Sequence, residues 1–164
     1  MNFFEELVDN KVLIFAGLAW IIAQIIKIIL TLVTEKKFRP DRIFGDGGMP
    51  SGHSATVTSL AVLVGWTQGF ASAAFAIAMI LAIIVMNDAV GVRREAGKHA
   101  ASIKELAEIV NQYFDAKDKE VRTEKLKLLV GHTPLQVFMG AALGIIVAIL
   151  CITIFDLPHP PFLS

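Results

Sequence analysis

The sequence predicts an all-α integral membrane protein, a bundle of about four transmembrane helices with one cytoplasmic amphipathic helix. Of its 164 residues, 55% are hydrophobic and only 18% are charged. The mean hydropathy of +0.64 is far above that of an ordinary soluble domain of this length. The formal net charge is zero and no basic stretch with interleaved aromatic residues occurs. The composition therefore argues against a nucleic-acid partner.

Four apolar runs are candidates for crossing a hydrocarbon core about 30 Å thick. We expect one membrane domain over residues 1–164, with spans over about 12–33, 55–68, 71–86 and 134–155 and polar loops over 34–54 and 87–133. The second and third runs are short and meet at Gly69-Phe70, which predicts a tight helical hairpin. The fourth begins with the stretch TPLQ at Thr133, whose threonine, proline and glutamine favour a capped helix start.

Small residues mark one face of the fourth run. Gly140 and Gly144 form a small-xxx-small pair, which lets a neighbouring helix approach closely. We therefore expect close helix packing at this face.

The long polar region before the fourth run contains an amphipathic helix. Apolar residues recur there at helical spacing: Ile103, Leu106, Val110 and Phe114. The following run, DAKDKEVRTEKLK, mixes both charge signs and is most simply a solvated helix or hinge.

Basic residues beside the spans predict the orientation. They follow the first and third spans: Lys36, Lys37, Arg39, Arg42, Arg93, Arg94, Lys98 and Lys104. The positive-inside rule then places both polar loops in the cytoplasm, and both termini and the hairpin tip outside. We expect a multi-pass protein of the cell membrane.

Two polar segments far apart in the sequence thus meet at one membrane surface, and each carries a histidine, His53 or His99. Arginines in both segments present planar, permanently charged forks that suit phosphate oxygens. The turn GGMPSGH leads into an apolar helix, so its backbone N–H groups and the helix dipole favour an anion. Two histidines beside such a site supply a nucleophile and an acid for cleaving a phosphate ester.

These residues resemble a known family. Pro50-Ser51-Gly52-His53 is similar to the central signature of the type 2 phosphatidic acid phosphatase and vanadium haloperoxidase superfamily. Arg93, followed after five residues by His99, resembles the third signature, and Arg39-Pro40 resembles the end of the first. With the surrounding GDGGMPSGHSA and DAVGVRREAGKHA, the chain is most similar to the divergent branch of that superfamily. The resemblance covers nearly the whole chain.

The resemblance implies a membrane-embedded phosphatase of a lipid phosphate or prenyl pyrophosphate. His99 would be the nucleophile that forms a phosphohistidine, and His53 the general acid that later activates water. The phosphate would be held by side chains and backbone amides at four positions: Arg39, Arg93, Ser51 and Gly52. No metal or other cofactor is implied, because arginines and amides supply the charge stabilisation.

The first departure from the family pattern concerns a lysine. The superfamily has one seven positions before the arginine of Arg39-Pro40, where this sequence has Leu32, and the nearest lysines are Lys27, Lys36 and Lys37. Lys27 lies inside the first span, with Gln24 one turn away on the same face. A lysine at that depth is costly unless it snorkels or meets an anion. Lys27 is therefore either a phosphate ligand or a snorkelling side chain.

The second departure concerns the residue that orients the nucleophile. Four positions after His99 the superfamily has an aspartate, and this sequence has Ile103. Without a carboxylate on one ring nitrogen, the tautomer and basicity of the other are poorly set. Glu95 could replace the aspartate if it shares a helix with His99, and Asp88 could do so from a neighbouring element.

The third departure removes a phosphate donor. The serine expected before Arg93 is Val92, and the neighbouring Arg94 would compensate. A magnesium ion held with a substrate phosphate is an alternative use of three aspartates on the same face, although their spacing matches no metal motif: Asp41, Asp46 and Asp88.

Two classes of function follow. The first is the lipid phosphatase, with membrane lipids and a phosphorylated lipid substrate as its partners. The second is a non-hydrolytic protein that binds or moves phospholipids or prenyl phosphates and keeps the anion site. Simpler roles also remain open, in which His53 caps a helix and His99 is an exposed helix residue. A bundle with two short members could also pair as a homodimer.

Overall fold

The computed structural model describes residues 2–35, 48–113 and 133–159. Those residues form six helices and no strand, which confirms the predicted all-α class. In chain order the helices are α1 (Phe3–Asp9), α2 (Lys11–Glu35), α3 (Gly52–Gln68), α4 (Ala73–Val90), α5 (Val92–Tyr113) and α6 (Pro134–Ile154).

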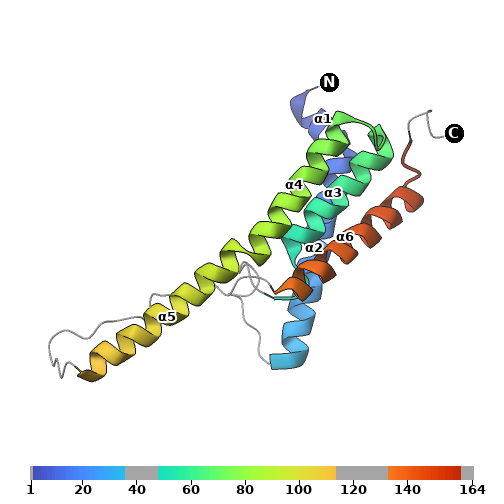
Figure 1. Ribbon diagram of the computed structural model, residues 1–164. Coiled ribbons are helices and arrows are strands. Elements are labelled where there is room, and N and C mark those ends of the chain that lie inside the picture. The colour runs from blue at the N-terminus through green and yellow to red at the C-terminus, as the bar shows by residue number, and fades with distance from the viewer. Residues whose placement is uncertain (1, 36–47, 114–132, 160–164) are drawn as a thin grey trace.

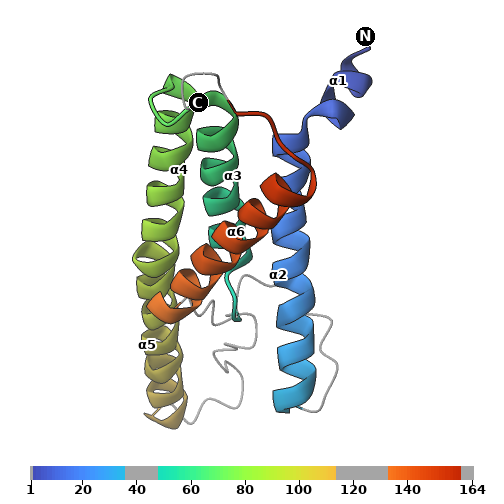
Figure 2. The same cartoon turned by 90° about the vertical axis from the view of Figure 1, so that its right-hand side faces the viewer.

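Helix α3 is the centre of the bundle. It packs against α2, α4 and α6, and α6 crosses it obliquely (Figure 2). The turn between α3 and α4 follows Gly69, whose φ of 90° is the left-handed conformation that glycine tolerates. Ser72 then caps α4 by accepting a hydrogen bond from the Phe75 N–H group. The hairpin lies where the Gly69-Phe70 stretch places it.

Three helices are long and apolar enough to cross a membrane among the described residues: α2, α4 and α6. Helix α3, which was expected as a fourth span, has 17 residues and packs against all three of these helices. The N-terminus, the α3–α4 turn and the end of the described chain lie at one end of the bundle, while α3 begins at the other (Figure 1).

The α3–α6 interface depends on the two glycines of α6. A Cβ atom on Gly140 would lie 2.4 Å from the Ser51 carbonyl oxygen, and one on Gly144 would lie 2.4 Å from that of Ala55. Both distances are far below van der Waals contact, so only glycine fits. The expected close packing at the small-xxx-small face is thus observed. The capping box at Thr133 and Gln136 is also present.

The bounds of α3 and α4 differ from the expected ones by a few residues. Helix α3 begins at Gly52 rather than near residue 55, because the Ser51 Oγ accepts the Ser54 N–H group and caps the helix. His53 therefore lies in the first helical turn, not in the preceding loop, and does not cap α3. Helix α4 continues to Val90, four residues beyond the expected end of the span.

Helix α5 continues from α4 almost without interruption and leads away from the bundle (Figure 1). The Glu95 N–H group donates to the Gly91 carbonyl oxygen, which keeps helical bonding across the junction. Among the described helices, α5 packs appreciably only against α4. Its expected apolar residues Ile103, Leu106 and Val110 are exposed, and Phe114 lies outside the described residues.

The chain after α6 folds back onto the bundle. The Trp66 Nε1–H group donates to the Leu157 carbonyl oxygen at 3.0 Å, and the Leu157 side chain is buried in the core. The rings of Phe15 and Phe155 are in contact, with centroids 4.8 Å apart. These contacts fix the end of α6 against α2 and α3.

Candidate anion-binding site

The turn before α3 is held by α6. The Ser51 N–H group donates to the Gln136 carbonyl oxygen at 3.0 Å. The Ser51 hydroxyl accepts hydrogen bonds from the Ser54 N–H group and the Ser54 hydroxyl, and the Ser51 residue is fully buried. Ser51 therefore uses its polar groups within the protein, where they fix the turn.

Two backbone donors remain at the start of α3. The first N–H groups of a helix have no acceptor within it. The Ser54 and Ala55 N–H groups are bonded to Ser51, whereas those of Gly52 and His53 form no hydrogen bond within the described residues. A helix N-terminus with free N–H groups is an anion site by dipole and by hydrogen bonding.

Helix α2 forms one wall beside these donors. A Cβ atom on Gly52 would lie 3.1 Å from Trp20 Cδ1 and 3.3 Å from Gln24 Nε2. The Gln24 Oε1 atom is buried and has no hydrogen-bond partner among the described residues. Because Trp20 and Gln24 are one helical turn apart, they form a continuous surface against Gly52.

Lys27 lies one turn farther along the same face of α2. Lys27 is buried, with a relative exposure of 3%. Gly48 has a φ of 103°, and a Cβ atom there would lie 3.1 Å from both Cγ and Cδ of Lys27. The turn therefore packs directly on the aliphatic stem of Lys27. Snorkelling to open water does not describe this side chain, which is enclosed by protein.

The position of Lys27 along α2 places it near the turn before α3, residues 48–51, which we call the signature turn. An α-helix rises about 24 Å between Lys11 and Lys27, in a hydrocarbon core about 30 Å thick. Lys27 thus lies close to the membrane surface opposite the start of α2, which is the surface where α3 begins. A cation at this height can reach an anion bound at that surface.

The site residues carried by α5 do not lie beside the start of α3. His99 is exposed, and Glu95 forms an ion pair with Lys98. Because α5 continues from the end of α4 and leads away from the bundle, the described structure does not bring His99 beside His53. His53 itself is exposed in the first turn of α3. Glu95 and His99 do share one helix, as their suggested pairing requires.

The remaining expected residues are described in part. Asp88 is partly buried in the last turn of α4. Arg93 and Arg94 lie in the first turn of α5, but the positions of their side chains are not described. Arg39, Asp41 and Asp46 lie outside the described residues, so both the arginine ligand of the first signature and the magnesium alternative stay predictions.

Three residues around the start of α3 were not expected from the sequence to contribute to the site. Trp20 and Gly48 contact the site, and the Gln136 carbonyl oxygen fixes the turn. A signal for Trp20 is present in its spacing from Gln24 and Lys27, which puts all three on one helix face. The roles of Gly48 and Gln136 depend on tertiary contacts that no sequence pattern displays.

Comparison with known proteins gives a consistent result. Residues 8–147 match the family model described as the divergent PAP2 family. The chain is also 39% identical over 150 residues to the uncharacterized membrane protein YuiD of Bacillus subtilis (strain 168), covering 88% of this chain and 95% of that protein. No solved structure matches the chain.

Proposed function

Because this chain belongs to the divergent PAP2 family, we propose that it is a membrane-embedded phosphatase of a lipid phosphate or prenyl pyrophosphate. The observation that supports this most is the start of α3, where the N–H groups of Gly52 and His53 have no acceptor among the described residues and α2 brings the buried Lys27 to the same end of the bundle. Two amides, a helix dipole and an ammonium group would together form a cationic site for a tetrahedral anion.

The proposed reaction proceeds in two steps. A nitrogen of the His99 imidazole attacks the terminal phosphorus, and the bond from that phosphorus to the leaving oxygen breaks. This is the lipid oxygen of a monophosphate or the bridging oxygen of a pyrophosphate, and His53 donates a proton to it. Water then attacks the phosphohistidine while His53 accepts its proton, which releases inorganic phosphate and restores both histidines. Arg39, Arg93 and Arg94 stabilise the charge on the phosphoryl oxygens, so the reaction requires no metal cofactor.

The reaction needs α5 to approach the start of α3. We place the pivot at Gly91, the single residue between α4 and α5. Its φ of −88° and ψ of −84° depart from helical values, so the junction already deviates from a regular helix. A change of backbone angles at one such residue can swing a whole helix, as hinges do in many enzymes. Closure would carry His99, Glu95 and Arg93 toward the phosphate together.

The substrate would enter from the bilayer. Its acyl or prenyl tail would lie among the apolar surfaces of the spans, where α4 exposes Ile77, Ile80 and Ile84. Its head group would reach the site from the cytoplasmic side of the cell membrane, the side that the positive-inside rule predicts for the turn before α3.

A second function is favoured by two specific observations. Ile103 stands where the superfamily pattern has the orienting aspartate, and α5, which carries His99, leads away from the start of α3. A protein that binds or moves phosphorylated lipids without hydrolysis needs the anion ligands at α3 and Lys27 but not the nucleophile.

One assay separates the two functions. Purified protein in mixed micelles is given a panel of lipid phosphates and prenyl pyrophosphates, and inorganic phosphate release is measured beside lipid-phosphate binding. The phosphatase proposal expects release that His99→Ala abolishes and His159→Ala retains, since His159 lies beside Trp66 at the other end of α3. Binding without release across the panel would support the second function. Neither binding nor release would contradict both.

A further inference from the structure

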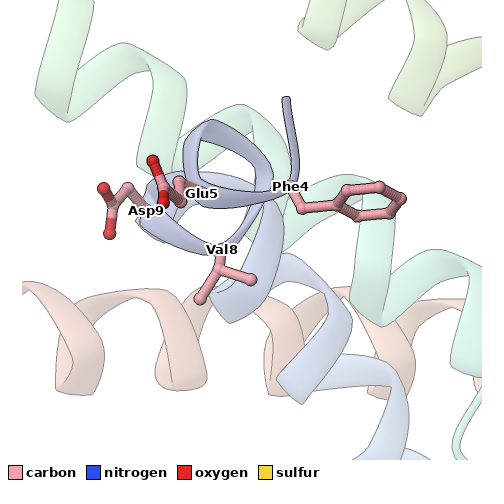
Figure 3. Close-up of a pocket in the computed structure, with 4 residues that line it drawn as sticks. All are labelled: Phe4, Glu5, Val8 and Asp9. Atoms are coloured by element: carbon pink, nitrogen blue, oxygen red, sulfur yellow. The ribbon is translucent and has the colours of Figure 1, made fainter. Parts of the chain in front are cut away.

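Helix α1 has two chemically distinct faces. At about 100° per residue, the side chains of Phe3, Phe4, Leu7 and Val8 fall within one arc of about 140°. The three carboxylates of the helix, Glu5, Glu6 and Asp9, occupy the other arc. Figure 3 shows Glu5 and Asp9 together on one side of α1 and the Phe4 ring on the opposite side, with Val8 between.

The apolar arc is uncovered within the described chain. None of the α1 residues is buried, and Phe3 and Phe4 are 70% and 75% exposed. Among the described helices α1 contacts α2, at the end where the two helices join. Four adjacent apolar side chains on one exposed face mark an interaction surface rather than a solvated helix.

Helix α1 is well capped but too short to be stable by itself. Asn2 and Glu5 form a capping box, in which the Glu5 carboxylate accepts the Asn2 N–H group at 2.9 Å. A helix of 7 residues remains marginal in water because nucleation is costly. A surface that covers the apolar arc would supply the missing stabilisation.

The apolar arc continues the lipid-facing surface of α2. The Asn10 Oδ1 atom accepts the Leu13 N–H group at 3.0 Å, which starts the new helix immediately after α1. The next residues of α2 that face outward are Leu13 and Ile14, both about half exposed. Since α2 is a candidate membrane span, the apolar arc of α1 begins where the bilayer surface must lie.

We infer that α1 is an interfacial anchor whose apolar arc inserts into the boundary between lipid head groups and acyl chains. Amphipathic helices of this kind bury their apolar face about 5 to 10 Å into that boundary. The acidic arc faces water, and α1 contains no basic residue. Its attachment therefore depends on apolar burial and suits a zwitterionic surface, whereas anionic head groups would repel it.

The anchor would also fix the height of α2 in the bilayer. Lys27 lies about 24 Å along α2 from Lys11 by helical rise. A fixed α1 would thus hold Lys27 near the opposite surface, where α3 begins. This inference is independent of the proposed reaction.

The test is a depth measurement on spin-labelled full-length protein. The chain has one cysteine, Cys151, so a Cys151→Ala background allows single labels at Phe4→Cys, Val8→Cys and, as a matched control, Glu6→Cys. The protein is placed in phosphatidylcholine and phosphatidylethanolamine vesicles, and collisions with oxygen and with a water-soluble nickel chelate are compared.

We expect labels at residues 4 and 8 to collide several-fold more with oxygen than with the chelate, and the label at residue 6 to show the reverse. Adding anionic lipid should make the first two labels shallower. Preferential collision with the chelate at all three positions would overturn the inference, because α1 would then lie in water. Protection of residues 4 and 8 from both reagents would also overturn it, because protein, such as a second copy of the chain, would then cover the arc.

Discussion

Gly140 on α6 lies directly against the backbone of Ser51, where a Cβ atom would come within 2.4 Å of the Ser51 carbonyl oxygen. The Ser51 N–H group donates to the Gln136 carbonyl oxygen, one turn earlier on α6. Two residues of α6, a helix far away in the sequence, therefore position the signature turn. The proposed anion site should therefore depend on the packing of α6.

Gly140→Ala should damage both stability and binding. The new methyl group meets backbone atoms that cannot rotate away, so α3 and α6 must separate. Overpacking of this kind typically costs about 1 to 3 kcal/mol. We expect a lower midpoint of thermal unfolding in detergent and weaker binding of lipid phosphate.

Gly17→Ala is the matched control. A Cβ atom on Gly17 would meet nothing within 4 Å, and alanine favours a helix interior over glycine by about 0.5 to 1 kcal/mol. This variant should be unchanged or slightly more stable. Equal losses in both variants would show that the α3–α6 contact has no special role.

Lys27→Met should weaken phosphate binding. Methionine keeps most of the aliphatic stem on which Gly48 packs and removes the buried ammonium group that we propose as an anion ligand. One hydrogen bond to a charged group is worth about 1.5 to 3 kcal/mol, so affinity should fall about tenfold or more. Calorimetry with a short-chain lipid phosphate measures this.

Lys11→Met is the control for charge alone, because Lys11 is exposed at the opposite end of α2. It should bind phosphate like the parent protein. A Lys27→Met variant with full affinity would remove Lys27 from the anion site and leave it a structural residue.

Ile103→Asp should raise the turnover number if His99 is the nucleophile. The substitution restores a carboxylate four residues after His99 on α5, where it can orient the imidazole. Ile103 is 50% exposed, so the cost in stability is small. Phosphate release by the purified variant should exceed that of the parent by about tenfold or more, since loss of such a carboxylate lowers rates by orders of magnitude.

Leu106→Asp places a carboxylate on the same exposed face of α5 but not at the family position. It should leave the rate unchanged. A similar rate for the parent and both variants would argue that Glu95 or Asp88 already orients His99, or that His99 is no nucleophile.

The orientation is tested by labelling single cysteines in intact cells. Lys98→Cys on α5 and Ala71→Cys at the α3–α4 turn are both exposed and lie toward opposite ends of the bundle. The positive-inside rule predicts that a membrane-impermeant maleimide labels residue 71 and not residue 98. Labelling of residue 98 alone would invert the topology.

Much of the local structure was predictable because its causes are local. Apolar runs of sufficient length predict the spans, the TPLQ stretch predicts the cap at Thr133, and the spacing of Gly140 and Gly144 predicts a close helix contact. The start of α3 was missed by three residues because the expected span followed the apolar run. The cap at Ser51, whose hydroxyl accepts the Ser54 N–H group, starts the helix earlier.

The arrangement of the site was less predictable because it depends on how helices are oriented. A shared membrane surface suggests that His53 and His99 meet, yet the continuous helical bonding through Gly91 directs α5 away from α3. The sequence likewise does not reveal that the Ser51 N–H group donates to the Gln136 carbonyl oxygen. Nor does it reveal that the N–H groups of Gly52 and His53 have no acceptor among the described residues. Lys27 is the opposite case, since its depth in an apolar run already marks it as unusual.

The most direct measurement is an experimental structure of the protein in lipid with orthovanadate bound. The account predicts vanadate at the start of α3, held by the N–H groups of Gly52 and His53, with α5 turned about Gly91 so that a His99 nitrogen contacts vanadium. Vanadate bound elsewhere, or imidazole rings of His53 and His99 too far apart to contact one anion, would contradict it.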